Sequence, residues 1–385
     1  MKRITILGAT GSIGTSTLDL IERAPDAFEV VALTANSDVK GLADAARRVR
    51  AKVAVVADEG KRDALREALA GSDTQVMAGE AALCEAAAIE ADWTMAAIVG
   101  CAGLRPVMTA LKRGGTMALA NKESLVSAGE VMLRAARESG ATVLPVDSEH
   151  NAVYQCFDSK APEQVRKVIL TASGGPFRDW PIDAMQAITP EQAVAHPNWS
   201  MGAKISVDSA TMMNKGLEVI EAFHLFPVEA EQLDILVHRQ SVIHSMVEYV
   251  DGSVIAQLGT PDMRTPIAYA LAWPRRMATP CPALDLATIG RLDFEAPDPA
   301  RFPALTLARS ALEAGGAAPA ILNAANEVAV AAFLNRKIGF LEIAAIVADT
   351  LERYEPAAPA DLDTVLGIDA EARARADERV KECVA

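Results

Sequence analysis

The sequence has few aromatic residues, no paired cysteine motif and no long apolar run. Aromatic residues make up 4% of the 385 positions, whereas hydrophobic residues reach 51% through an excess of alanine, which favours a helix-rich α/β protein. The five cysteines are scattered and form no C-x-x-C pair, so neither a disulfide framework nor a zinc site is expected. The longest apolar run, 95–104, is about half the length that crosses a bilayer.

Positively charged residues are also few, since the sequence has 37 Lys and Arg against 51 Asp and Glu, which gives a net charge of −14. Non-specific binding to nucleic acid requires a basic surface, so this class of partner is excluded. A small anionic substrate remains compatible, because a few local lysine or asparagine side chains suffice to hold it. No signal peptide precedes the first apolar strand, and unpaired cysteines are typical of a cytoplasmic protein, which we expect here.

A glycine-rich turn between an apolar strand and a helix indicates a nucleotide site near the N-terminus. The strand covers 3–7, the turn reads GATGSIG over 8–14, and helical periodicity follows over 16–23. Such a turn lets the backbone approach a pyrophosphate, while the N-terminus of the helix supplies free N–H groups. The G-x-x-G-x-x-G spacing is a variant of the commoner G-x-G-x-x-G, so an ordinary glycine turn is the alternative.

The second strand, 29–33, leads into small neutral residues before Asp38. An NAD site usually has an acid at this strand end, which binds the ribose 2′-hydroxyl. Small neutral residues instead leave room for a 2′-phosphate and favour NADP. The choice stays open, because the Asp38 carboxylate can serve as the missing acid.

Strands at 53–56, 95–99 and 116–119 continue the α/β alternation. The polar run 121–123 follows the last of them, and ligands of parallel sheets bind at such strand ends. We therefore interpret this run, with its single cation Lys122, as part of a site. An exposed polar loop is the alternative.

Two carboxylates follow the next apolar strand, 142–145. If the extended backbone continues, Asp147 and Glu149 point to the same side, because side chains alternate along a strand. Neighbouring carboxylates repel unless a cation or a proton lies between them, so the pair predicts a site for a hard metal ion. A solvated acidic turn is the alternative.

Two loops in the middle of the chain offer further ligand contacts. The SGG turn at 173–175 follows a strand and presents a hydroxyl and backbone donors to an anion. The segment HPNWSMG, 196–202, is interpreted as a lid in which Trp199 and Met201 supply apolar cover and His196 a titratable donor. A packed structural loop is the alternative for the second segment.

Asn214, Lys215 and Glu218 share one face of a helix predicted over 211–222. Together with Ser209 they combine an amide, a cation, a carboxylate and a hydroxyl. Such a group can bind a phosphate at one end and supply a metal ligand at the other. A solvated helix face would carry similar residues.

The remaining two fifths of the chain predict a second sheet followed by helices. Three strands with an Asp-Gly turn before the last predict an antiparallel sheet separate from the first, over 233–238, 241–249 and 253–258. The stretch 275–303 is rich in proline and predicts a linker, and the alanine-rich 304–385 has helical periodicity.

Several stretches spread over nearly the whole chain form a specific combination. They read GATGSIG (8–14), ANKESLV (120–126), PVDSEHNA (145–152), SGGPF (173–177), HPNWSMG (196–202), ISVDSATMMNKGLE (205–218), PDMRTPIA (261–268) and LNAANE (322–327). In this combination and order the sequence resembles the 1-deoxy-D-xylulose 5-phosphate reductoisomerase family of the non-mevalonate isoprenoid pathway. A plain NADP-dependent sugar-phosphate dehydrogenase and a nucleotide-sensing module are the alternatives, and neither needs a metal site.

The resemblance implies an α/β protein with a Rossmann-like NADP-binding domain over 1–146 and a central α+β catalytic and metal-binding domain over 147–274. It further implies the lid 196–202, the linker 275–303 and a C-terminal helical bundle over 304–385. The implied cofactors are NADPH and a divalent cation, Mg²⁺ or Mn²⁺, and the implied assembly is a homodimer. The implied reaction rearranges and reduces 1-deoxy-D-xylulose 5-phosphate, a phosphorylated sugar, to 2-C-methyl-D-erythritol 4-phosphate.

The resemblance also assigns roles to individual residues. The implied metal ligands are Asp147, Glu149 and Glu218. The implied substrate contacts are Lys122, Ser148, Glu149, Ser173, His196, Trp199, Ser209, Asn214, Lys215 and Glu218. The implied cofactor contacts are Thr10, Gly11, Ser12, Ile13, Ala35, Asn36, Ser37, Asn121, Glu123 and Gly202. The implied catalytic residues are Lys122, Asp147, Glu149, His196 and Glu218.

Overall fold

The computed structural model describes residues 1–195, 199 and 201–384, and its chain divides into two compact units. Unit 1 comprises Met1–Ser124, Met132–Asn151 and Asp262–Cys281. Unit 2 comprises Leu125–Val131, Ala152–Pro261 and Pro282–Ala385. The four-part division expected from the sequence remains a prediction.

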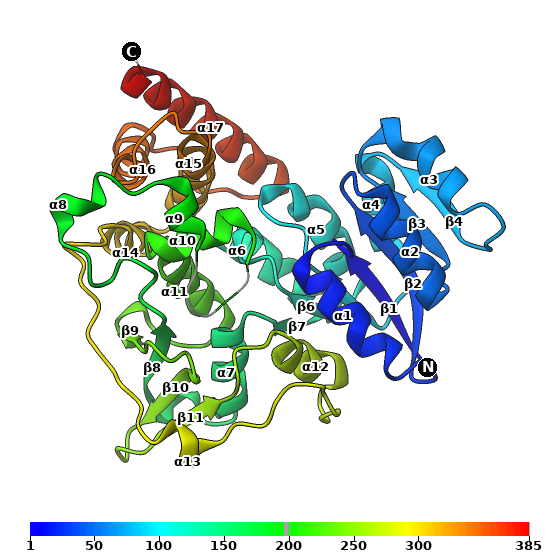
Figure 1. The fold of residues 1–385 in the computed structure, drawn as a ribbon, viewed down its shortest axis with the longest axis horizontal. Coiled ribbons are helices and arrows are strands. Elements are labelled where there is room, and N and C mark those ends of the chain that lie inside the picture. The colour runs from blue at the N-terminus through cyan, green and yellow to red at the C-terminus, as the bar shows by residue number, and fades with distance from the viewer. Residues whose placement is uncertain (196–198, 200, 385) are drawn as a thin grey trace. The chain divides into compact units, whose positions relative to one another are not determined.

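Unit 1 is built around a seven-stranded parallel sheet with the order β4-β3-β2-β1-β5-β6-β7 (Figure 1, blue to cyan). Its strands are β1 (Lys2–Leu7), β2 (Phe28–Ala35), β3 (Val53–Val56), β4 (Gln75–Ala78), β5 (Trp93–Ala96), β6 (Thr116–Leu119) and β7 (Thr142–Pro145). The strand order reverses between β1 and β5, and ligands of such sheets bind outside the carboxyl ends of the strands at this point. The predicted Rossmann-like architecture is confirmed.

The strands of unit 1 form where the chain carries short apolar runs. β3, with the sequence VAVV, is buried on both faces, as is usual in a parallel sheet. The predicted strand 95–99 is shifted, because the chain leaves the sheet after Ala96 and Val99 is exposed. β4 was missed, since it is a short edge strand whose first residue is polar and exposed.

Helices connect these strands, and one of them returns late in the chain. They are α1 (Ser12–Glu22), α2 (Val39–Val49), α3 (Arg62–Ala68), α4 (Glu80–Ala88), α5 (Leu104–Arg113), α6 (Lys122–Ser139) and α12 (Arg264–Ala272). α12 packs against α1, where Arg264 forms an ion pair with Asp19 at 3.2 Å. The Trp93 indole N–H of β5 donates to the Ala270 carbonyl at 3.0 Å, so α12 is integral to unit 1.

Unit 2 contains a four-stranded sheet with the order β11-β10-β8-β9. Its strands are β8 (Val165–Ala172), β9 (Leu233–Val237), β10 (Ile243–Tyr249) and β11 (Val254–Leu258). A separate second sheet was predicted and is confirmed, with Gly252 (φ 86°) in the turn between β10 and β11. The sheet is mixed and not purely antiparallel, because β8 and β9 pair in parallel after a long helical connection.

Most helices of unit 2 share one core with its sheet. α7 (Ser148–Cys156) crosses from unit 1 into unit 2, and the middle of α6 also belongs to unit 2. The others are α8 (Ile182–Met185), α9 (Pro190–Val194), α10 (Ala203–Ala210), α11 (Met213–Leu225), α13 (Leu286–Ile289), α14 (Ala304–Ala314), α15 (Ala318–Leu334), α16 (Glu342–Arg353) and α17 (Leu362–Val384). The short 3-10 helices are η1 (Glu59–Lys61) and η2 (Cys101–Gly103) in unit 1, and η3 (Pro162–Gln164) and η4 (Ala230–Gln232) in unit 2.

The C-terminal helices confirm the predicted helical region. α15 packs against α14, α16 and α17, and its Leu322 and Phe333 join a buried cluster with Val168 and Val247 of the sheet. Within the described part of the chain, no helix has both the length and the apolar character that a membrane crossing requires. All five cysteines lie in that part, and no disulfide joins them.

Candidate active site

The glycine-rich turn lies at the carboxyl end of β1, held close to the loop after β5. Gly8 has a φ of 91°, and a Cβ there would lie 2.6 Å from the Ala97 carbonyl oxygen. Gly14, in the first turn of α1, packs directly on the backbone of Gly8 and Ala9. These contacts require glycine at both positions.

The predicted cofactor residues of this turn lead into the N-terminus of α1. Gly11 is the N-cap of α1 and provides no side chain to bind the first N–H groups. The turn residues Thr10, Gly11, Ser12 and Ile13 are exposed or half-buried, so their backbone is accessible to a ligand. An accessible helix N-terminus at the switch point of a parallel sheet suits a pyrophosphate.

The Asp38 side chain caps α2. Its Oδ1 accepts a hydrogen bond from the Gly41 backbone N–H at 2.9 Å, and Gly41 leaves no room for a Cβ beside this carboxylate. Ala35 is buried at the end of β2, whereas Asn36 and Ser37 are exposed. The N-cap pattern, an aspartate directly before helical periodicity, could have identified this role from the sequence.

We expect Asp38→Ala to lower the free energy of unfolding by about 1 kcal/mol, because α2 loses its N-cap. The ratio of kcat/KM for NADPH to that for NADH should stay unchanged, since the carboxylate already has a structural partner. Thermal unfolding and steady-state kinetics with both cofactors test this. Asp58→Ala is a matched control, because Asp58 caps η1 through Gly60 at 3.0 Å. A selective fall in kcat/KM for NADH would instead make Asp38 the ribose-binding acid.

Lys122 and Asp147 form an ion pair in unit 1. β6 and β7 are neighbours in the sheet, so their carboxyl ends bring together the start of α6 and the loop after β7. Asn121 caps α6 by accepting from the Ser124 N–H at 2.9 Å, and its amide donates to the Gly100 carbonyl at 3.0 Å. Asn121, Lys122 and Glu123 are all buried, which excludes the alternative of an exposed polar loop.

Asp147 and Glu149 do not lie on an extended strand, contrary to the sequence-based expectation. β7 ends at Pro145 and α7 begins at Ser148, so the strict alternation of side chains stops before Asp147. The Asp147 carbonyl accepts the first helical bond, from the Asn151 N–H at 2.8 Å. Asn151 stabilises this helix start, because its amide donates to the Pro145 carbonyl at 2.9 Å.

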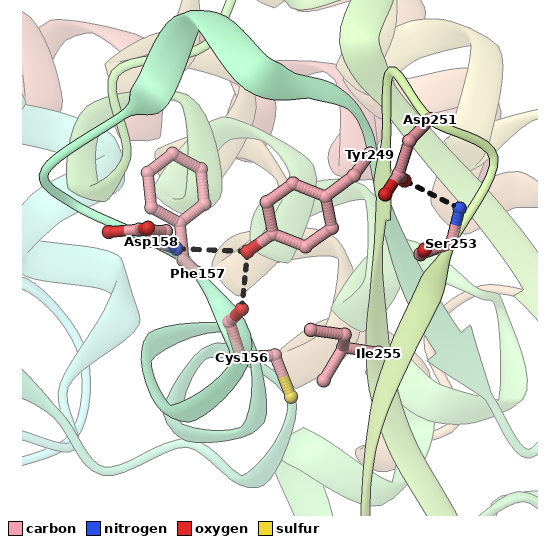
Figure 2. A pocket seen from close by; sticks show the side chains of 7 residues that line it. All are labelled: Cys156, Phe157, Asp158, Tyr249, Asp251, Ser253 and Ile255. Carbon is pink, nitrogen blue, oxygen red and sulfur yellow. Dashed lines mark hydrogen bonds between the residues drawn. The ribbon is translucent and has the colours of Figure 1, made fainter.

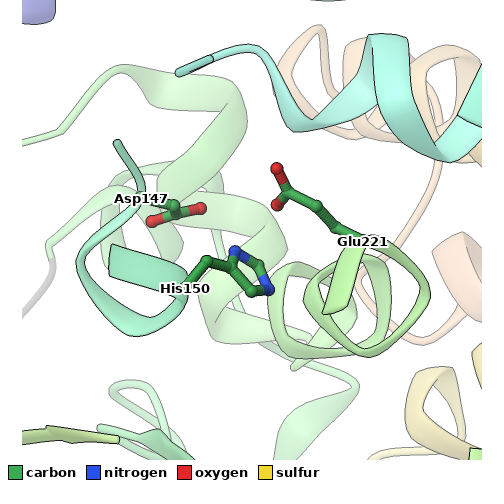
Figure 3. A group of neighbouring side chains, drawn as sticks. All are labelled: Asp147, His150 and Glu221. Atoms are coloured by element: carbon green, nitrogen blue, oxygen red, sulfur yellow. The ribbon is translucent and has the colours of Figure 1, made fainter. Parts of the chain in front are cut away.

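Polar side chains crowd the first turn of α7. The Ser148 hydroxyl donates to Glu149 Oε2 at 2.5 Å, and Asp147 and Glu149 are only half-buried. His150 is fully buried on the same turn, and Figure 3 shows it beside Asp147, with Glu221 drawn on α11 of unit 2. Sequence reasoning did not select His150 or Glu221, although a histidine or a carboxylate one turn from a predicted ligand would have been a usable signal.

In unit 2, Asn214, Lys215 and Glu218 form one hydrogen-bonded group on α11. Glu218 is 0% exposed and accepts from the Asn214 amide at 2.5 Å and from the Lys215 ammonium. The predicted common face is confirmed, and the burial of Lys215 and Glu218 excludes a solvated helix face. A buried carboxylate needs such partners, because its desolvation is otherwise unfavourable by several kcal/mol.

The Ser173 turn and the last turn of α10 lie side by side in unit 2. A Cβ on Gly175, which has a φ of 68°, would lie 2.7 Å from the Ser209 carbonyl oxygen. The Gly175 N–H donates to the Ser173 hydroxyl at 3.2 Å. Arg178 Nη1 donates to the carbonyls of Ser173 and Gly175 at 3.2 and 3.1 Å, and sequence reasoning missed this residue. The fold thus brings two predicted substrate-binding segments together.

The predicted lid, 196–202, is covered only in part. His196, Pro197, Asn198 and Ser200 lie outside the described residues, so the role of His196 stays a prediction. The Trp199 ring lies 6.2 Å from the His244 ring, between centroids, and Trp199 is half-buried. Gly202 is the exposed N-cap of α10, next to the half-buried Met201.

Family profiles match most of the chain. The profile described as 1-deoxy-D-xylulose 5-phosphate reductoisomerase matches residues 4–129, and two profiles described as C-terminal domains of the same enzyme match 143–226 and 258–375. The chain is 62% identical over 375 residues to a 1-deoxy-D-xylulose 5-phosphate reductoisomerase of Zymomonas mobilis, covering 97% of each protein. It is 59% identical over 380 residues to one of Rhodospirillum centenum, covering 99% of this chain and 94% of the relative.

Solved structures agree with this assignment. A Zymomonas mobilis reductoisomerase in complex with NADPH superposes with a TM-score of 0.94 at 60% identity, covering 98% of this chain and 99% of that one. A reductoisomerase in complex with NADPH, fosmidomycin and magnesium gives a TM-score of 0.94 at 44% identity, covering 99% and 98%. The sequence, the fold and the local geometry of each unit therefore agree, and the chain belongs to the 1-deoxy-D-xylulose 5-phosphate reductoisomerase family.

Proposed function

We propose that this protein converts 1-deoxy-D-xylulose 5-phosphate to 2-C-methyl-D-erythritol 4-phosphate by an NADPH- and divalent-metal-dependent rearrangement and reduction. The observation that carries the proposal is the hydrogen-bonded group of Asn214, Lys215 and Glu218, in which Lys215 and Glu218 are buried. It supplies hydrogen-bond donors for a phosphate, together with a carboxylate, within one segment of a chain that matches the family along its length. A nucleotide-sensing module has no use for this group.

The donor set suits a hard divalent cation. Asp147, Glu149 and Glu218 each offer a carboxylate oxygen, which is the ligand type that Mg²⁺ and Mn²⁺ prefer. A cation held by these carboxylates would supply Lewis-acid polarisation of the substrate carbonyl.

The remaining residues are assigned to binding the substrate phosphate, stabilising developing charge and excluding water. The substrate phosphate is held by Ser173, Ser209, Asn214 and Lys215. Lys122 stabilises negative charge that develops on the substrate oxygen, and Ser148 hydrogen-bonds the substrate. Trp199, with His196, covers the substrate and excludes water from the reactive intermediate.

NADPH supplies the hydride for the reduction. Thr10, Gly11, Ser12 and Ile13 bind its pyrophosphate through their backbone, as the accessible N-terminus of α1 suggests. Ala35, Asn36 and Ser37 leave room for the ribose 2′-phosphate. The other assigned cofactor contacts are Asn121, Glu123 and Gly202.

The direct test mixes the purified protein with NADPH, 1-deoxy-D-xylulose 5-phosphate and Mg²⁺ or Mn²⁺, and follows the loss of NADPH absorbance. Oxidation should stop with EDTA and return when excess metal is added. The carbon skeleton of the product, read by NMR, separates the reactions: a branched product requires rearrangement, whereas an unbranched alcohol would identify a plain dehydrogenase. Binding of NADPH without any turnover would favour the nucleotide-sensing module.

We also infer that the protein forms a homodimer through β11. This strand lies at the edge of the unit 2 sheet, and Val254 and Ile255 are 52% and 48% exposed. An unprotected apolar edge strand promotes association, and a second copy related by a two-fold axis would cover it. Ile255 also lines a shallow pocket shown in Figure 2, together with Cys156, Phe157, Asp158, Tyr249, Asp251 and Ser253.

Hydrogen bonds hold the residues that line the pocket beside β11, which suits a surface that packs against a second copy of the chain. The Tyr249 hydroxyl donates to the Cys156 carbonyl at 2.7 Å and accepts from the Asp158 N–H at 3.0 Å. Burial raises the pKa of the Cys156 thiol to about 11, so this thiol stays protonated near neutral pH and is not a reactive nucleophile.

We expect Ile255→Asp to convert the dimer to a monomer, because it places a charge in the apolar contact. Light scattering after size exclusion should give about half the native mass. Ile182→Asp is the control, since Ile182 is also an exposed apolar residue but lies on α8. A monomeric native protein, or an Ile255→Asp protein that stays dimeric, would remove β11 as the interface.

A further inference from the structure

α15 is an alanine-rich core helix that nevertheless buries asparagine. Asn323 and Asn326 are both 0% exposed. A buried amide is unfavourable unless it is hydrogen-bonded, and alanine would fit the composition of this helix. The Asn326 amide donates to Asp208 Oδ1 at 2.7 Å, so α15 makes a polar contact with α10.

The partner of Asn326 is a buried carboxylate. Asp208 is 1% exposed, and its Oδ2 accepts from the Lys204 ammonium at 2.8 Å, one turn earlier on α10. Buried charged groups of this kind are poor sources of stability, because apolar residues of similar volume usually do as well or better. Their best-attested contribution is to fix one arrangement of the elements that they join.

The arrangement fixed here is that of the last turn of α10. Asp208 directly precedes Ser209, and its carbonyl accepts from the Thr211 hydroxyl at 3.2 Å. The Ser209 carbonyl packs on Gly175 of the neighbouring turn. Met212 then adopts a left-handed conformation (φ 64°), from which α11 begins. The hydrogen bond from Asn326 to Asp208 therefore acts on the orientation of Ser209 and on the start of α11.

We propose that Asp208 and Asn326 are a positioning pair that holds the Ser209 turn in the orientation in which it grips the substrate phosphate. This inference rests on the proposed function, in which Ser209, Asn214 and Lys215 bind that phosphate. Neither residue of the pair touches substrate; Asn326 acts from α15 through Asp208. The C-terminal helices thereby contribute to phosphate affinity and not only to the stability of unit 2.

The test compares Asn326→Ala with the native protein. KM for the sugar phosphate and the inhibition constant of inorganic phosphate should both rise about tenfold, the usual effect of losing one charge-assisted hydrogen bond. kcat and the Kd for NADPH should change little, because the metal and cofactor residues are untouched. Glu327→Ala is the matched control, since Glu327 lies next along α15 but pairs with Arg373 of α17. It should lower Tm without changing KM.

A swapped pair separates positioning from general destabilisation. Asn326→Asp alone places two carboxylates face to face, whereas the double variant Asp208→Asn, Asn326→Asp restores a hydrogen bond with the donor on the other side. The double variant should recover most of the native KM. The inference is overturned if Asn326→Ala keeps the native KM, or if Glu327→Ala raises KM equally. Failure of the proposed function is distinguishable, because the native protein would then show no metal-dependent turnover of the sugar phosphate.

Discussion

Glu218→Gln is expected to lower kcat about a thousandfold, the effect of removing one preorganised charged group from a reaction centre. Glutamine keeps the size of the side chain but removes the negative charge that we assign to metal binding. The Kd for NADPH should not change, since Glu218 is not among the residues assigned to cofactor binding. Turnover at increasing Mn²⁺, together with NADPH titration, measures both effects.

Two features of α11 decide how this experiment is controlled. Lys215 donates to Glu218, so the substitution also breaks a buried ion pair and should destabilise the protein by about 3–5 kcal/mol. Assays must therefore run well below the measured Tm of the variant. Glu221→Gln is the matched control on the same helix, because Glu221 is equally buried. If Glu221→Gln abolishes the metal response and Glu218→Gln does not, the assignment of Glu218 as a metal ligand is wrong.

Lys122→Met should lower kcat/KM about a hundredfold, because an electrostatic contact to developing charge is lost. Methionine retains the apolar length of the buried side chain, so unit 1 should remain folded. Lys122 also pairs with Asp147, and the variant should therefore change the Mn²⁺ concentration needed for half-maximal activity. Steady-state kinetics at several metal concentrations give both numbers.

The control for this second experiment is Lys112→Met, an exposed lysine in the last turn of α5. Its kcat/KM should equal that of the native protein. Full activity of Lys122→Met would show that the ammonium serves only to neutralise Asp147. An altered metal requirement with unchanged kcat at saturating metal would assign Lys122 to orientation of the carboxylate alone.

The sequence predicted those parts of the fold that depend on local pattern. Apolar runs located β3, β6 and β7, and helical spacing placed Asn214, Lys215 and Glu218 on one face of α11. β4 was not predicted, because an edge strand buries few side chains and therefore lacks a clear apolar run in the sequence. The expectation that Asp147 and Glu149 lie on an extended strand was wrong, because a four-residue strand says nothing about where the next helix starts.

Contacts between distant segments required the structure. The pairing of Lys122 with Asp147 depends on β6 and β7 being neighbours, which no local pattern encodes. The close approach of Gly175 to Ser209 depends on a left-handed glycine and on the path of α10. The role of Asp38, in contrast, did not require the structure, since an N-cap is a local feature that the sequence pattern could have identified.

The late return of α12 to unit 1 has a consequence for synthesis on the ribosome. All seven strands of the sheet are complete once Pro145 has been made, but the carbonyls that bind Trp93 and Lys2 belong to Ala270 and Leu271. At a translation rate of about 5–20 residues per second, these residues follow on the order of ten seconds later. During this interval the nascent sheet lacks one of its covering helices and is vulnerable to premature association. A chain that stops before α12 should for the same reason expose that surface permanently, and should be poorly soluble when expressed without the rest.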